Sequence, residues 1–145
     1  MAIGDIGEVI DSLEFDPVAG YYSDIIHVAG NIYAIAYTDS DDHGWLKTVS
    51  IAGNGSIGAV IDSLEFDPVW GYLPVIIHIA GNVYAIAYEG GPGYNGWLKT
   101  VSIAGNGSIG AVIDSLEFDP AVGSYPDIIH IAGGVYAIAY TGPDY

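Results

Sequence analysis

Apolar residues alternate in size along the segment Val83–Tyr88. The odd-numbered positions are valine, alanine and alanine, and the even-numbered positions are tyrosine, isoleucine and tyrosine. Successive side chains of a β-strand point to opposite sides, so one face is small, the other is large, and both are apolar. This pattern predicts a strand in a sheet that packs on an equivalent sheet on each side, with bulky residues filling the space left by small ones.

The chain is built from an internal repeat. The 25-residue block Gly44–Pro68 recurs without change at Gly96–Pro120, and the histidines His27, His78 and His130 give a period of 51 residues and then 52. Each repeat carries four strand signals in the order DIIHVAG, IYAIAY, WLKTVSI and IGAVIDSLEFD. A Gly-Asn or Gly-Gly pair separates the first two signals, which is the spacing of a tight hairpin. We therefore expect the first and second strands to be antiparallel neighbours.

The fourth strand signal has one polar face. In its N-terminal copy, Ile6–Asp16, the apolar Leu13 and Phe15 alternate with a serine and two acids. Such alternation is typical of a strand with one solvated side. The sequence therefore predicts an all-β fold in which each repeat runs from apolar inner strands to a half-solvated outer strand.

Four-stranded antiparallel units that recur every 51 to 52 residues resemble the blades of a β-propeller, and the resemblance covers the whole chain. It is greatest to the lectin-type and kelch-like propellers, and the near-identity of the copies resembles that of amplified or engineered symmetric propellers. No Trp-Asp pair ends the third strand, unlike in WD40 repeats. The resemblance implies a single domain over 1–145, with a partial outer strand in 1–23, blades in 24–67 and 75–119, and a partial blade in 127–145.

The strand signals number eleven, or about 2.75 blades of four strands, whereas propellers typically have four to eight blades. The last copy has no third strand signal to receive the N-terminal fourth strand. One chain would therefore expose strand edges and an apolar face to water. We expect copies of the chain to complete the ring as a homo-oligomer, with two chains in a six-bladed ring as the simplest case. The alternative is head-to-tail association into a larger ring or filament.

Differences between the copies are concentrated in two connections, which lead into the first strand and out of the second. Both emerge at the same end of an up-and-down blade, and loops on a rigid scaffold often carry binding residues. The aromatic residues of these connections are the candidate ligand-binding residues: Tyr21, Tyr22, Trp70, Tyr72, Tyr94 and Tyr125. Such rings could stack on sugars or anchor a protein partner. The alternative is that they only pack one loop against another.

Asp39, Asp41 and Asp42 are candidate calcium ligands. They lie in the segment DSDDHG, which has acids at alternate positions and a glycine, as calcium loops do, but lacks the distal glutamate of an EF-hand. The alternative is a solvated acidic turn. We expect no other cofactor.

The three repeated histidines could surround a common axis and bind a metal after oligomerisation. We expect instead that each is a structural hydrogen-bonding group, tied to the loops or to a hydroxyl of the neighbouring strand such as that of Ser50, Ser102 or Thr48. The outer-strand acids, for example Asp62 with Glu65, recur in every copy, which favours a charged and soluble edge over acid–base catalysis. No nucleophile triad or phosphate-binding glycine loop is found in the sequence, and we expect no enzyme.

Eighteen acidic residues against two lysines give a net charge of −16, which repels nucleic acid and anionic membranes. The sequence shows no membrane-spanning run and no intact signal peptide, so we expect a soluble protein, extracellular if a signal peptide was removed. The expected function is non-enzymatic: a self-assembling propeller with a variable binding face for carbohydrate, as in lectins. The alternative is a structural or engineered scaffold whose function is assembly itself.

Overall fold

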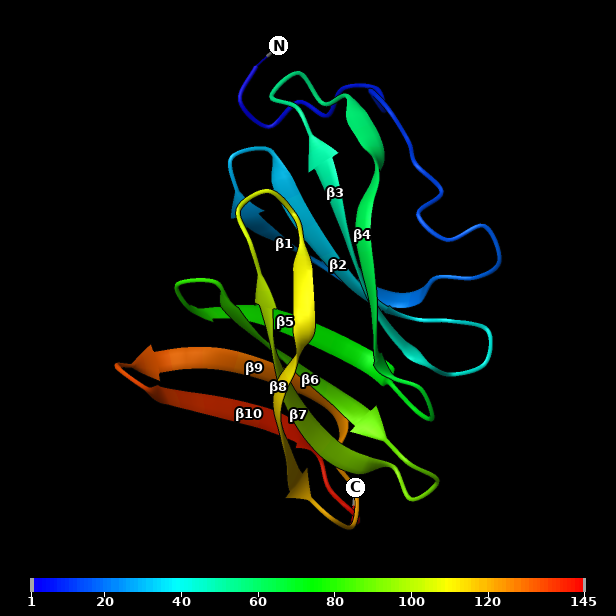
Figure 1. Ribbon diagram of the computed structural model, residues 1–145, viewed down its shortest axis with the longest axis vertical. Coiled ribbons are helices and arrows are strands. Elements are labelled where there is room, and N and C mark those ends of the chain that lie inside the picture. The colour runs from blue at the N-terminus through cyan, green and yellow to red at the C-terminus, as the bar shows by residue number, and fades with distance from the viewer. Residues whose placement is uncertain (1, 145) are drawn as a thin grey trace.

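The computed structural model describes residues 2–144 and confirms the expected all-β class. Its strands form antiparallel sheets of four, four and two strands (Figure 1). The first sheet contains β1 (Tyr21–Ala29), β2 (Ile32–Thr38), β3 (Gly44–Ile51) and β4 (Ile57–Asp67). The second contains β5 (Tyr72–Ala80), β6 (Val83–Gly90), β7 (Asn95–Ile103) and β8 (Ile109–Asp119), and the third contains β9 (Ser124–Ala132) and β10 (Val135–Thr141). Among the described residues, no helix has the length and apolar character needed to cross a membrane.

Each first strand turns back onto the second through the predicted two-residue hairpin. The turn glycines Gly30, Gly81 and Gly133 have φ values of 51°, 54° and 52°, in the left-handed region that glycine adopts without strain. The histidine three residues before each glycine makes a hydrogen bond to this turn. The distances from Nε2 of His27, His78 and His130 to the glycine carbonyl oxygen are 2.8, 2.8 and 2.7 Å. The expected structural hydrogen bond to a loop is therefore confirmed, and the hydroxyl alternative is wrong, because the turn brings a carbonyl within reach of the ring.

The small face of one sheet packs on the large face of the next, as the alternation in size predicts. Ala34 and Ala36 of β2 are fully buried, and they share a core cluster with Tyr84, Ile86 and Tyr88 of β6. The alanines leave room for the rings of the neighbouring sheet, which gives the close packing of a protein interior.

The three first strands lie together at the inner side of the sheets, because β5 contacts both β1 and β9. The fourth strands lie at the opposite edges of their sheets, where exposure alternates along β4 and five consecutive residues of β8, 113–117, are exposed. The sheets thus follow one another in chain order, with β9–β10 at the end remote from the N-terminal segment (Figure 1).

The predicted N-terminal strand at 6–16 does not form. This segment is extended but makes no sheet, because no third strand pairs with it among the described residues. Its side chains still occupy outer-strand positions. Phe15 packs on Tyr37 with ring centroids 5.1 Å apart, as Phe66 of β4 packs on Tyr88 at 5.2 Å. The expectation was therefore wrong for the backbone pairing, although the segment contacts the first sheet much as β4 contacts the second.

Candidate ligand-binding site

Four of the six candidate aromatic residues were expected in loops, but they lie at the beginnings of first strands. Tyr21 and Tyr22 begin β1, Tyr72 begins β5, and Tyr125 is the second residue of β9. The expected strand boundary was too late because the pairing continues past a bulge: Tyr21 pairs with Thr38 before the register shifts. Bulges re-aim side chains, and they are common next to functional sites.

The bulges place large residues in the left-handed backbone region. Tyr22, Leu73 and Tyr125 occupy equivalent positions in the three sheets, with φ values of 51°, 52° and 52°. A non-glycine residue in this region costs about 1–3 kcal/mol, and such residues cluster at binding and active sites. The same strained conformation therefore occurs near the start of the first strand in all three sheets.

The structure brings five of the six candidate rings into one continuous row. The ring centroids are 6.4 Å apart for Tyr21 and Tyr22, and 4.7 Å apart for Tyr22 and Tyr72. The row continues from Tyr72 to Trp70 at 6.3 Å and from Trp70 to Tyr94 at 6.4 Å. These separations are typical of interacting aromatic pairs. Residues up to 73 positions apart in the chain thus form one surface, which we call the aromatic row.

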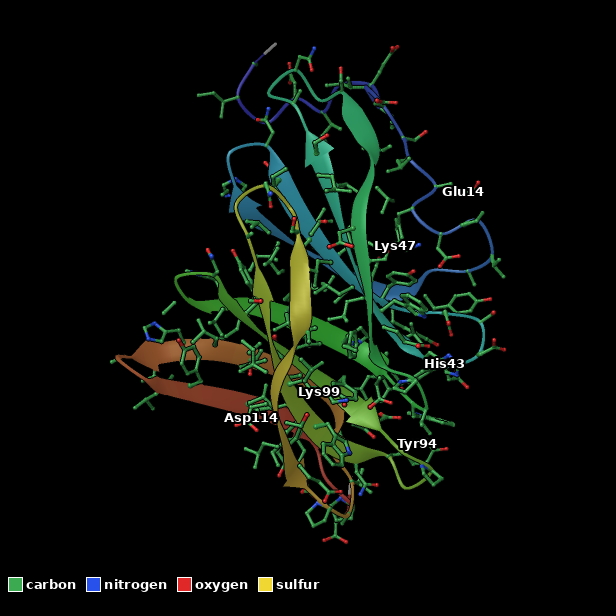
Figure 2. The ribbon with its side chains drawn as sticks, in the orientation of Figure 1. Glu14, His43, Lys47, Tyr94, Lys99 and Asp114 are labelled. Carbon is green, nitrogen blue, oxygen red and sulfur yellow. The ribbon has the colours of Figure 1, made fainter. Side chains whose placement is uncertain are left out.

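Tyr125 joins the aromatic row through two adjacent grooves. One groove, of about 360 Å³, lies between the starts of β1, β5 and β9, where Tyr22, Leu73 and Tyr125 all contribute to its wall. The other, of about 410 Å³, lies between Tyr72, Tyr94 and Tyr125. Figure 2 shows Tyr94 on the loop between β6 and β7, on the same side of the molecule as His43 of the corresponding loop. The diversified connections therefore meet at one end, as the sequence predicts.

Glu89 is a site residue that the sequence analysis missed. It lines the second groove, and only 3% of its surface is exposed. Burial raises the pKa of Glu89, and a hydrogen bond with Ser124 offsets part of this rise. The equivalent residues in the other copies are Thr38 and Thr141, so the replacement of threonine by an acid is the signal that could have found it.

Polar groups of the aromatic row interact with one another. The hydroxyl of Tyr72 donates to that of Tyr22 over 2.8 Å, and this bond, together with burial and nearby negative charge, raises the pKa of Tyr72 to about 12. The indole N–H of Trp70 is buried and has no hydrogen-bond partner among residues 2–144. The row thus combines exposed rings with neutral hydroxyls and one unsatisfied donor.

The candidate calcium ligands do not converge. The carboxylate of Asp39 accepts hydrogen bonds from the backbone N–H groups of Asp41 and His43 and from the indole of Trp45, at 2.8–2.9 Å. Within the described part of the chain, no three histidine, cysteine or acidic residues form a group suited to a metal ion. Asp39 is instead a hydrogen-bonding acceptor that fixes its own loop.

The outer-strand acids connect successive sheets. Asp62 Oδ2 of β4 accepts the backbone N–H of Ile109 at the start of β8 over 2.7 Å, and Asp67 Oδ2 accepts the hydroxyl of Tyr88 over 2.7 Å. Lys99 of β7 also reaches Asp67, and Figure 2 shows it in the second sheet with Lys47 at the corresponding place in the first. These carboxylates therefore hold one sheet to the next, a role beyond the soluble edge that we expected.

Comparisons with protein-family models, curated protein sequences and solved structures gave no match to this chain.

Proposed function

We propose that the protein is a non-enzymatic binding protein whose aromatic row and adjacent grooves bind a carbohydrate. The observation that carries this proposal is the convergence of six diversified aromatic residues at one end of a repetitive scaffold. A role limited to packing one loop against another would hide these rings from water. Tyr22 and Tyr94 are each 51% exposed, and Tyr125 is 71% exposed, so their surfaces are accessible to a ligand.

A sugar suits both components of this site. Its C–H faces can pack on exposed tyrosine and tryptophan rings, while its hydroxyls need donors and acceptors placed around them. Glu89 and Ser124 supply such groups in the second groove, and Ser23 and Asp24 supply them in the first. An uncharged ligand also fits a chain of net charge −16, which repels anionic ligands.

The test is a glycan array followed by calorimetric titration of the sugars that bind. Trp70→Ala and Tyr72→Ala should each weaken binding at least about tenfold, because each removes a ring contact and its buried area. Tyr33→Ala is the matched control, since Tyr33 stacks on His27 at the hairpin end of the first sheet. No bound sugar, or equal losses in the three variants, would count against carbohydrate binding.

Assembly is the second candidate function, and it is favoured by two complementary open faces. In the first sheet Ile25 is 54% exposed, whereas its equivalents Ile76 and Ile128, which have a preceding sheet to pack on, are 3% exposed. At the other end of the molecule, Ile129 of β9 is 58% exposed beside the small residues Ala137 and Ala139 of β10. The part of the large face around Ile25 thus remains open at one end of the sheet order, although the N-terminal segment covers the same face at Tyr37, which is fully buried. The small face of β9–β10 remains open at the other end, and the two faces are of the kinds that pack one sheet on the next within the chain.

On this proposal, several chains continue the same packing around an axis to form one propeller, with two chains as the smallest closed ring. Native mass spectrometry measures the number of chains. Ile129→Asp should dissociate the assembly by placing a charge in the packed face, and Val69→Asp, at a 68% exposed loop position of the second sheet, is the control. A monomer at micromolar concentration for the unmodified chain would contradict the assembly and leave the carbohydrate proposal untouched.

A further inference from the structure

The third strand of the second sheet places a lysine in a box formed by β4 of the preceding sheet and by the neighbouring strand β6. Lys99 Nζ of β7 donates to the carbonyl oxygen of Phe66 over 2.7 Å and lies 3.4 Å from Asp67 Oδ2. It also lies 5.8 Å from the ring centroid of Tyr88. The ammonium group is therefore bound by a carbonyl, a carboxylate and an aromatic face, of which the first two are charge-assisted contacts.

The first sheet repeats this arrangement. Lys47 Nζ donates to the carbonyl oxygen of Phe15 over 2.8 Å, lies 3.5 Å from Asp16 Oδ2, and lies 5.5 Å from the centroid of Tyr37. Two lysines from two third strands thus bind in the same way. They are also the only basic residues other than histidine in the sequence.

The third sheet has the same box without a lysine. The Tyr140 hydroxyl donates to Asp119 Oδ2 over 2.9 Å, and the rings of Phe118 and Tyr140 are 5.1 Å apart. The corresponding tyrosine-to-carboxylate distances in the occupied boxes are both 2.7 Å. The geometry is therefore formed in advance, and neither lysine of the chain reaches it.

The edge of β10 next to this box is open. In the second sheet, β6 pairs with β7 over its whole length, with Ile86 opposite Lys99 and Tyr88 opposite Trp97. In the third sheet, β10 pairs with β9 on one side and has no strand on the other among the described residues. A strand paired to β10 in the register of β7 would place its lysine opposite Ile138, which is the equivalent of Ile86, and beside Asp119.

We propose that the free edge of β10 is an acceptor for a lysine-bearing β-strand with the third-strand pattern WLKTVSI, supplied by a partner protein. Backbone pairing gives the affinity and the lysine box fixes the register, which is how strand addition to a sheet edge is generally made specific. The charge of the chain supports this choice of occupant, because a basic strand is attracted to a protein of net charge −16. The inference does not depend on carbohydrate binding.

The experiment adds a synthetic peptide with the sequence of residues 95–108 to the full chain. Fluorescence anisotropy measures the affinity, and hydrogen exchange locates the bound strand. We expect saturable binding of one peptide per chain and new protection of the backbone amides of β10. A peptide carrying Lys99→Met should bind at least about tenfold more weakly, because it loses the charge-assisted contacts.

The matched protein variant is Asp119→Asn, which changes one group of the empty box. It should weaken the unmodified peptide about tenfold and leave the affinity of the Lys99→Met peptide unchanged. Equal affinity of the two peptides for the unmodified chain would overturn the inference, as would protection at β4 or β8 in place of β10. Failure of the peptide to bind, including failure because β10 of a second copy already covers the edge, would overturn it as well.

Discussion

The second and third sheets contain the same six residues, VYAIAY, in different surroundings. In β6 this segment lies between two neighbouring sheets and next to β7, and Tyr88 is fully buried; in β10 the equivalent Tyr140 is 40% exposed. The backbone pairing to the preceding strand is equivalent in both. The identical segment therefore pairs with its preceding strand in the same way in both sheets. The burial of its side chains depends on which other strands and sheets pack against it.

The contacts within each repeat are insensitive to this difference. The distance between the His130 and Tyr136 ring centroids is 4.9 Å in the third sheet, against 5.0 Å for His78 and Tyr84 in the second. The tyrosine-to-aspartate hydrogen bond, which joins each hairpin to the preceding sheet, is also kept. Local geometry thus forms without the outer strands, and the missing neighbours change the energy that each contact contributes.

The largest expected effect comes from removing the two tyrosines. Tyr88→Ala should lower the free energy of unfolding by about 3–5 kcal/mol, because it leaves a cavity between two sheets. Tyr140→Ala should cost about 1 kcal/mol or less, since water already reaches this ring. Urea denaturation followed by tryptophan fluorescence measures both values. Equal losses would mean that β10 is covered in solution.

The next largest effect on the free energy of unfolding is expected from replacing the aspartates that accept hydrogen bonds from these tyrosines. Burial pushes the pKa of Asp67 upward, but hydrogen bonds from Trp70, Tyr88 and Val69 and the charge of Lys99 hold it below its ordinary value. A carboxyl with a lowered pKa in the folded state stabilises the fold above the unfolded pKa of about 3.9, and this contribution is lost as the pH falls through the folded value. Asp67→Asn should therefore cost about 2–3 kcal/mol at pH 7, and progressively less below about pH 4.

Asp119→Asn is the comparison at the third sheet, because Asp119 of β8 accepts the hydroxyl of Tyr140. The pKa of Asp119 is also lowered, by the backbone N–H of Ala121 and the hydroxyl of Tyr140, so the sign of the pH dependence is the same. The carboxyl is exposed and has no lysine, and the loss should be smaller than for Asp67→Asn at every pH. Denaturation midpoints measured from pH 2.5 to pH 7 check the order, and a larger loss for Asp119→Asn would contradict it.

Much of this architecture follows from the sequence because the same local patterns occur in more than one copy of the repeat. Strand order, hairpins and the small-on-large packing are local or pairwise properties, and the alternation in Val83–Tyr88 specifies them. The segment 6–16 shows the limit: its sequence matches a strand, but a strand needs a partner, and pairing is a property of two segments.

The location of the candidate site was predictable from the sequence, but the predicted set of its residues was incomplete. The diversified connections identified the aromatic residues, since the up-and-down order of the strands places both connections on the same side of the sheets. Glu89 was missed because it is acidic, and only the aromatic residues of the diversified connections were taken as ligand-binding candidates. The lysine box also depends on contacts between sheets, between Lys99 and Asp67 for example, which no single repeat reveals.

The smallest expected effect compares Glu89 with Thr141, its equivalent in β10. Burial raises the pKa of Glu89, so its ionised form destabilises the fold as the pH rises above the ordinary value of about 4.3. Glu89→Thr should therefore raise the free energy of unfolding by about 1 kcal/mol at pH 7, because it removes a buried carboxylate that is ionised at this pH. The new hydroxyl does not stay unsatisfied, since it can donate to a carbonyl as Thr38 does to Gly71 over 3.0 Å. This gain should disappear below about pH 4, where the glutamate is neutral.

The reverse change, Thr141→Glu, lies where no further sheet buries the side chain among the described residues, and it should alter stability by less than about 0.5 kcal/mol. Sugar binding gives the opposite order: Glu89→Thr should weaken it, and Thr141→Glu should leave it unchanged. A variant that is more stable and binds less would show that the acid at this position serves the ligand at a cost to stability. If Glu89→Thr gained stability and bound sugar as before, the second groove would have no part in binding.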